Sequence, residues 1–242
     1  MRRRFFVDQF ADGRAFMAGE TAHHLGRVLR AEPGQLYELS DGNRVWLARI
    51  AEVQRDRVEF SLIEELSSRE PSVPTVLLLS VVKFDAFEFA LEKATELGVS
   101  AIVPLVAARS EKSLLAAAPK RAERWKKILR EASQQSRRVR IPELAPLSKP
   151  EAAFSSHCDR LKILLSERPE ARPLRGILEG QNVRAAVVLA IGPEGGWTEA
   201  EVQCAQTHSF REASLGRLIL RTETAVIAAL ASVNYGLSGQ ES

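Results

Sequence analysis

Cysteine and long apolar runs are both scarce in this sequence, and each shortage excludes a class of protein. Cys158 and Cys204 are the only cysteines among 242 residues, too few and too far apart for a disulfide framework or a metal-binding cluster. No segment approaches the roughly 18 apolar residues of a membrane span. The N-terminal arginines are followed by Asp8 and Asp12 instead of an apolar stretch, which is not the pattern of a secretory signal. These absences favour a globular protein of the cytoplasm.

The charge of the chain is small in total but uneven along its length. A formal net charge of +3 does not by itself indicate a nucleic-acid-binding protein. Residues 1–30, however, contain six arginines against three acidic residues, and residues 120–140 contain nine lysines and arginines against two glutamates. Such local patches attract phosphate in a salt-dependent way. Either patch alone also fits an ordinary solvated surface.

The first 65 or so residues are predicted to form a small β-rich module. The segment from Gln35 to Leu66 alternates apolar and polar residues over short runs, with hairpin turns at Asp41-Gly42 and Arg55-Asp56. The preceding GETAHHLGRVLR suits a short helix with Thr21 as its N-cap. Two prolines and several polar residues in SSREPSVP, residues 67–74, then predict a linker.

From Thr75 onward the pattern changes to buried strands that alternate with helices. TVLLLSVV, SAIVPLV, LKILLS and AAVVLAIG are predicted strands, and REASLG is a shorter one. The predicted helices are DAFEFALEKATELG, ended by Gly98, the basic APKRAERWKKILREASQQS, TEAEVQCAQTH, capped by Thr198, and the final TETAVIAALASVNYGL. This alternation predicts an α/β domain with a parallel sheet.

The stretch LAIGPEGGWTEAE places three glycines directly after a buried strand, where open α/β sheets bind their ligands. Gly192, Gly195 and Gly196 allow the backbone to approach a ligand closely or to adopt a positive φ. The stretch lacks the lysine of a P-loop and the spacing of a Rossmann fingerprint, and Glu194 disfavours an anionic nucleotide. A cationic ligand is compatible with it. A tight strand-to-helix turn without any ligand is the alternative.

LGRLILRTETAVIAAL is unusual because a cation begins its helix. Thr222 can cap the helix, and Glu223 is favoured by the helix dipole. Arg221 stands at the positive end of that dipole, where its charge is mildly unfavourable. This placement suggests another partner for the arginine, such as a phosphate or a reacting base.

The two segments resemble the signature stretches of the SPOUT superfamily, the trefoil-knotted methyltransferases, and within it the ribosomal small subunit methyltransferase E family. MRRRFFV, HHLGRVLR, KFDAFEFALEKATELGV and RWKKILREASQQSRRVRIPE match in the same order, so the resemblance runs from residue 2 to about 235. The chain departs from the family pattern at Leu218, where arginine is common, at Arg137, where glycine is common, and at Gln134, where glutamate is common.

This resemblance implies a fold, a reaction and a cofactor. The implied fold is a PUA-like RNA-binding β-barrel over residues 1–70, followed by a knotted α/β methyltransferase domain over residues 71–242. The implied reaction moves a methyl group from S-adenosylmethionine to N3 of one uridine in 16S rRNA, without a metal ion, in a homodimer. The implied cofactor-binding residues lie in three loops: Ser166, Ile191, Gly192, Pro193, Glu194, Gly195, Gly196, Leu215, Gly216, Arg217, Leu218, Ile219, Leu220, Thr222 and Thr224.

Two further residues are candidates for the chemistry itself. Arg221 would stabilise the charge that spreads onto the uracil oxygens when N3 loses its proton, and Glu223 would accept that proton. The expected phosphate contacts are Arg2, Arg3, Arg4, Arg27, Arg30, Lys126, Arg130 and Arg138. The rival interpretations are a related enzyme that methylates a ribose 2′-hydroxyl of tRNA and a non-catalytic ribosome-assembly factor.

Overall fold

The computed structural model describes residues 3–67, 71, 73–156, 160–181 and 186–237. The chain divides into two compact units, one of Met1–Glu70 with Ser133–Ile141 and the other of Pro71–Ala132 with Pro142–Ser242. The segment 133–141 thus belongs with the first unit. The single domain boundary expected after residue 70 assigns this segment to the second domain instead. Residues 68–70 and 72 of the predicted linker lie outside the described residues.

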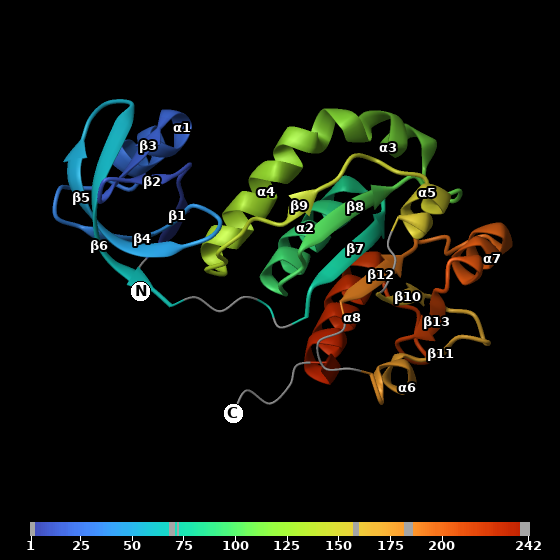
Figure 1. Ribbon diagram of the computed structural model, residues 1–242. Coiled ribbons are helices and arrows are strands. Elements are labelled where there is room, and N and C mark those ends of the chain that lie inside the picture. The colour runs from blue at the N-terminus through green and yellow to red at the C-terminus, as the bar shows by residue number, and fades with distance from the viewer. Residues whose placement is uncertain (1–2, 68–70, 72, 157–159, 182–185, 238–242) are drawn as a thin grey trace. The chain divides into compact units, whose positions relative to one another are not determined.

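The first unit is a six-stranded, curled sheet with strand order β1-β4-β5-β6-β3-β2 (Figure 1). β1 and β4 are parallel, and the other neighbours are antiparallel. Its apolar side chains, among them Leu25, Leu39 and Phe60, form one buried core. The β-rich prediction is confirmed, as a half-barrel rather than a closed barrel. The strands are Arg4–Phe6 (β1), Phe10–Ala11 (β2), Arg14–Ala18 (β3), Leu36–Ser40 (β4), Val45–Val53 (β5) and Arg57–Leu66 (β6).

The segment 133–141 is fastened to β1 and β4 by polar bonds. Arg4 forms an ion pair with Glu38 at 2.9 Å and also donates to the Arg137 carbonyl, and the Ser40 hydroxyl donates to the Val139 carbonyl at 2.7 Å. Arg137 has a φ of 56°. An L-residue pays a steric cost in this left-handed region, and glycine would not.

The second unit is a parallel sheet of seven strands in the order β11-β13-β10-β12-β7-β8-β9. β7, β10 and β12 are buried along their whole length, as their continuous apolar sequences predict. The predicted strands are confirmed. Their bounds are Thr75–Ser80 (β7), Ala101–Leu105 (β8), Glu143–Leu144 (β9), Leu161–Leu165 (β10), Arg172–Pro173 (β11), Val187–Ile191 (β12) and Arg211–Ser214 (β13).

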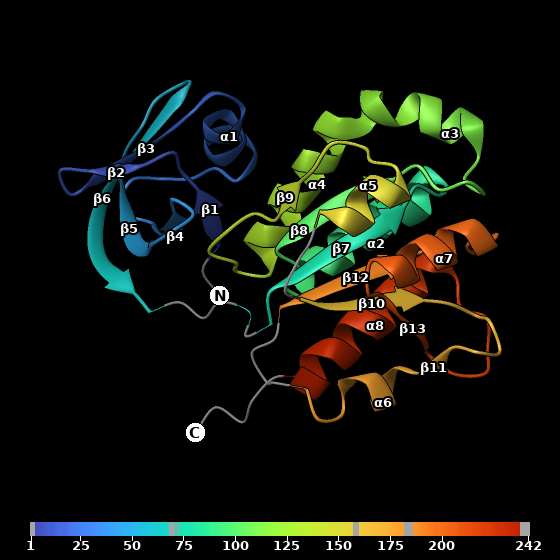
Figure 2. The same ribbon diagram turned by 45° about the vertical axis from the view of Figure 1, so that its right-hand side comes forward.

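Helices cover both faces of this sheet (Figures 1 and 2). α5 and α7 pack together over a core that includes Leu78, Leu164 and Val188, and α2 packs against α8 on the other face. Gly98 follows the end of α2 with a φ of 89°, as predicted. The helices are Phe84–Glu96 (α2), Lys112–Ala117 (α3), Ala122–Gln135 (α4), Pro150–Ser155 (α5), Leu174–Leu178 (α6), Glu199–Thr207 (α7) and Thr222–Leu237 (α8).

Three helix predictions are wrong in detail. The N-cap of α1 (Gly19–His23) is Ala18 and not the predicted Thr21. The helix begins earlier because the chain leaves β3 through Gly19, which has a φ of 64°. The segment His24–Val28 continues it as a π-helix. The basic helix is not continuous from Ala118, since a 3₁₀ turn with Pro119 near its start precedes α4. In α8 the Arg221 carbonyl accepts the first helical bond, from Ala225 N at 2.8 Å, so Arg221 occupies the capping position predicted for Thr222.

Candidate cofactor pocket

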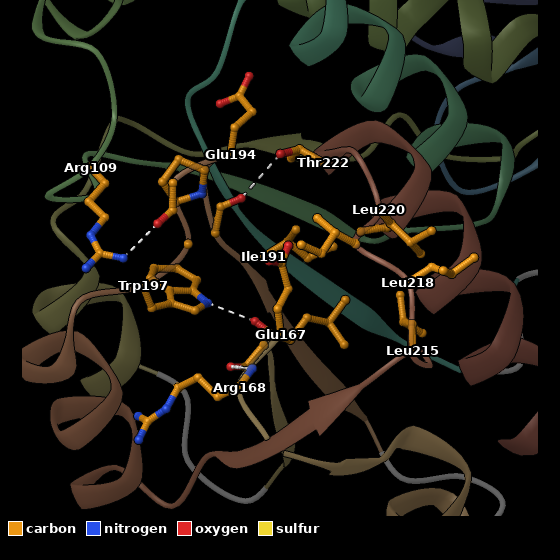
Figure 3. Close-up of a pocket in the computed structure, with 18 of the residues that line it drawn as sticks. Arg109, Glu167, Arg168, Ile191, Glu194, Trp197, Leu215, Leu218, Leu220 and Thr222 are labelled. Atoms are coloured by element: carbon orange, nitrogen blue, oxygen red, sulfur yellow. Dashed lines mark hydrogen bonds between the residues drawn. The ribbon is translucent and has the colours of Figure 1, made fainter. Parts of the chain in front are cut away.

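A pocket of about 310 Å³ lies at the carboxyl ends of β10 and β12 (Figure 3). Its lining comes from residues 165–168 after β10, residues 191–197 after β12 and residues 215–220 before α8, together with Arg109, Thr222 and Ala225. Open parallel sheets bind small ligands at this edge, and the volume is within the range of small-molecule sites. The two glycine-containing segments singled out in the sequence therefore meet in one cavity.

Two of the glycines after β12 leave little room for a side chain. A Cβ atom at Gly192 would lie 3.1 Å from Cε2 of the Trp197 indole, and one at Gly195 would lie 3.3 Å from Cβ of Arg109. Gly196 has a φ of 68°, which favours glycine for a different reason. We call residues 192–197 the glycine loop. Its backbone faces the pocket directly, since no side chain intervenes at three of its positions.

Trp197 joins the glycine loop to the end of β10. Its indole Nε1 donates to the Leu165 carbonyl at 2.9 Å (Figure 3), and its ring packs edge-on against Phe154 with centroids 6.0 Å apart. The side chain is 7% exposed. A buried indole bonded in this way links the glycine loop to the end of β10 and so restrains the spacing between two walls of the pocket.

A capping box joins the glycine loop to the loop after β8. The Thr198 hydroxyl accepts from Glu201 N, and Glu201 Oε2 accepts from Thr198 N at 2.8 Å. This confirms Thr198 as the N-cap of α7. The other carboxylate oxygen of Glu201 accepts from Ala108 N at 2.8 Å. One glutamate thus starts α7 and also holds the neighbouring loop.

The wall opposite the glycine loop is apolar. Ile191, Leu215, Leu218 and Leu220 gather on this side of the pocket in Figure 3. Leu218 and Ile219 are 81% and 78% exposed, although both line the pocket. Two adjacent aliphatic side chains that are this exposed to solvent form an apolar surface, which another apolar group can bury.

Charged groups at the pocket differ in whether they are compensated. The Arg168 guanidinium points away from the cavity and lies 3.2 Å from Glu199 and 3.7 Å from Glu212 (Figure 3). Its charge is therefore neutralised, and it ties the loop after β10 to α7 and β13. Glu167 and Glu194 are exposed at the rim. Negative charge at this rim is compatible with a ligand that has a cationic centre, and the Glu194 carboxylate itself points away from the cavity in Figure 3.

The structure brings together all but one of the residues predicted to bind a cofactor. Thr224 alone of that set does not line the pocket. Arg109, Leu165, Glu167, Arg168, Trp197 and Ala225 line it and are not in that predicted set. The sequence could have indicated Trp197 as a pocket residue, because it directly follows Gly195 and Gly196. Arg109 follows a buried strand in a loop without any motif, so only its position at the carboxyl edge could have indicated it.

Neither predicted catalytic residue lines the pocket. Arg221 and Glu223 flank Thr222, which does line it, and the Arg221 side chain is exposed. The Thr222 hydroxyl faces the Gly192 carbonyl at 3.5 Å, so the start of α8 touches the glycine loop. The roles of Arg221 and Glu223 stay predictions.

The predicted phosphate contacts fall into two groups. Arg4 and Arg138 are 7% and 9% exposed, and the Arg4 guanidinium is engaged with Glu38, so neither presents a free surface charge. Arg2 lies outside the described residues. The remaining predicted contacts are exposed: Arg3, Arg27, Arg30, Lys126 and Arg130.

Metal and thiol chemistry find no support in the described part of the chain. No group of three or more His, Cys, Asp or Glu side chains there could hold a metal ion. Cys204 on α7 has a raised thiol pKa, because burial and the charge of Glu151 disfavour the thiolate. This thiol is a poor nucleophile at neutral pH. No helix among the described residues has the length and apolarity to cross a membrane.

Comparison with known proteins agrees with this geometry. The RNA methyltransferase domain family matches residues 69–234, and the RNA methyltransferase PUA domain family matches residues 18–63. The ribosomal RNA small subunit methyltransferases E of Synechocystis sp. and Bacillus subtilis are 33% and 30% identical to the chain. The matches cover 94% and 96% of this chain and 75% and 96% of the relatives.

Two solved structures have the same fold and contain the cofactor. The methyltransferase E of Neisseria gonorrhoeae bound to S-adenosyl methionine has a TM-score of 0.88 and 30% identity over 100% of both chains. A methyltransferase of Legionella pneumophila in complex with the same cofactor has a TM-score of 0.87 and 28% identity, covering 97% of this chain and 98% of the other. The chain therefore belongs to the RNA methyltransferase family, and within it to the ribosomal RNA small subunit methyltransferases E.

Proposed function

We propose that this protein transfers a methyl group from S-adenosylmethionine to N3 of a uridine in the 16S rRNA of the small ribosomal subunit. The observation that carries the proposal is the meeting of the glycine loop and residues 215–220 in one pocket, in a chain whose relatives are rRNA methyltransferases. An enzyme of rRNA acts where ribosomes are, so we place it in the cytoplasm.

The pocket fits this cofactor in shape and in charge. Backbone groups of the glycine loop can bond an adenosine at close range, because Gly192, Gly195 and Gly196 line the pocket without side chains of their own. The leucines opposite offer apolar cover for its ring. Glu167 and Glu194 are compatible with a sulfonium, whereas the loop has no lysine for a nucleotide triphosphate. When bound, the cofactor supplies an electrophilic methyl group.

The protein's part in the reaction is to position the base and to move one proton. Uracil N3 is a poor nucleophile while it carries its proton, and it is occupied in a Watson–Crick pair, so the uridine must be unpaired. Glu223 accepts the N3 proton, and the exposed Arg221 guanidinium stabilises the negative charge on O2 and O4. Both flank the pocket-lining Thr222, so each is one residue from the wall. The exposed basic residues Arg3, Arg27, Arg30, Lys126 and Arg130 hold the RNA backbone.

The protein is proposed to act as a homodimer. Leu218 and Ile219 are adjacent, aliphatic and largely exposed, and they lie at the rim of the pocket. A second copy of the chain would bury them and close that side of the site. The trefoil knot implied by the family resemblance is likewise retained as part of this proposal.

Methyl transfer is tested with tritiated S-adenosylmethionine on deproteinised 16S rRNA and on intact small subunits. The expected product, after digestion to nucleosides, is N3-methyluridine. Label on a ribose would contradict the assigned atom. Cofactor binding without transfer to either substrate would favour an assembly factor.

Gly192→Ala is expected to weaken cofactor binding by about 5- to 150-fold, since overpacking of about 1–3 kcal/mol arises where neighbours cannot move. The added methyl would press on Trp197, which is held by Leu165. Calorimetry measures the Kd. The matched control is Gly176→Ala on α6, where no atom lies within 4 Å of the new Cβ. Equal affinity in both variants would contradict a tightly packed glycine loop.

Arg221→Ala and Glu223→Gln are expected to lower kcat by about 10²-fold or more while the Kd for the cofactor stays the same. The exposed Arg211→Ala on β13 serves as the control and should keep full activity. Single-turnover rates and calorimetry separate the two quantities. Loss of cofactor binding together with turnover would make Arg221 a cofactor or folding residue instead.

Ile219→Asp is expected to shift the dimer toward monomer, because a buried carboxylate without a partner is costly at an interface. Val28→Asp changes a side chain that is 62% exposed in the first unit, and it should leave the assembly unchanged. Sedimentation velocity over a range of concentrations makes the measurement. A wild-type protein that is monomeric throughout that range would refute the dimer.

A further inference from the structure

Arg109 lines the pocket from the loop between β8 and α3, residues 106–111. In Figure 3 its side chain lies across the glycine loop from Leu215, Leu218 and Leu220. The apolar wall and this arginine thus occupy opposite sides of the site. A ligand that fills the apolar side does not need the guanidinium.

The Arg109 side chain is held at its guanidinium end, where Nη1 donates to the Gly195 carbonyl at 2.7 Å. The backbone beside it is fixed as well: Ala108 N donates to Glu201, and the Ser110 hydroxyl donates to the Val81 carbonyl at 2.9 Å. An exposed arginine held in this way has already lost much of the rotamer freedom that binding would otherwise cost.

The charge of Arg109 has no acidic partner among the described residues. A guanidinium has five N–H donors, and one of them is used by Gly195. Arg168, in contrast, has three glutamates within 4 Å and points away from the cavity. The basic residues of α4 are also compensated in part, since Arg124 pairs with Glu88 and Lys126 with Glu123. A fixed, exposed and uncompensated guanidinium at a pocket rim is arranged to bind an anion.

We propose that Arg109 binds a backbone phosphate of the substrate RNA next to the nucleotide that is methylated. This inference rests on the proposed function and extends it by naming a phosphate contact inside the site. Two N–H groups of a guanidinium match two oxygens of a phosphodiester. Every nucleotide beside an unpaired target base carries such a group, so a strand whose base enters the pocket must place a phosphate near its rim. The same contact to Gly195 couples a bound phosphate to the loop that holds the methyl donor.

Three variants at this position separate charge from loop support. Arg109→Gln keeps an amide donor for Gly195 but removes the charge, Arg109→Lys keeps the charge but loses the planar pair of donors, and Arg109→Ala removes both. Lys112→Ala is the matched control, because Lys112 is an exposed cation at the start of α3 that does not line the pocket.

The measurements are KM and kcat for methyl transfer, the Kd for S-adenosylmethionine, and the salt dependence of binding to a fluorescent 16S rRNA fragment. Arg109→Gln is expected to raise the KM for RNA about tenfold and to reduce the slope of log K against log salt by about 0.7, the contribution of one phosphate on single-stranded RNA. The kcat and the cofactor Kd should stay within about twofold. Arg109→Lys should recover part of the RNA affinity.

Three results would overturn the inference. Weaker cofactor binding in Arg109→Gln with unchanged RNA affinity would assign the anion to the cofactor's carboxylate. An equal loss in Lys112→Ala would show a general charge effect, and unchanged RNA binding in all three variants would show loop support only. The proposed function fails separately, if the wild-type protein transfers no methyl group to rRNA in the same assay.

Discussion

The glycine loop can form this pocket only because side chains from other segments hold its backbone. Loops without side chains are flexible, since glycine has more conformational freedom to lose on folding than any other residue. Here the Trp197 indole is bonded to Leu165, Gly195 accepts from Arg109, and Glu201 joins the start of α7 to Ala108. The neighbouring strands β10 and β12 and the loop after β8 therefore act as one frame around the loop.

Such a frame matters for a reaction whose protein contribution is largely geometry. Aligning a donor and an acceptor can supply about 7–11 kcal/mol of a barrier, but only if both are held near the reactive geometry. The buried parallel strands provide rigid positions, and the polar bonds at their ends transmit that rigidity to the loop. At Gly192 the backbone lines the pocket without a side chain, and the Trp197 indole packs directly against that glycine.

The sequence was most informative where one segment determines its own structure. The apolar runs of β7, β10 and β12 predicted buried parallel strands, and Thr198 predicted the start of α7. Most of the pocket followed from the family resemblance, which implied the three cofactor-binding loops. Contacts between distant segments could not be read in this way: Arg109 bonds a residue 86 positions away, and the Trp197 indole one 32 positions away. The capping position at Arg221 was missed because Thr222 turns toward Gly192.

The distribution of compensated and uncompensated charge divides the site into two functional sides. A cationic cofactor and a polyanionic substrate must lie within bonding distance of each other, and a uniform field would repel one of them. On the side of β13 and α7, glutamates neutralise Arg168. At the rim, the Glu167 carboxylate lies on the loop after β10, while the Arg109 guanidinium lies on the loop after β8 and has no acidic partner among the described residues. Because the opposite charges come from different loops, one small pocket can attract both partners at once.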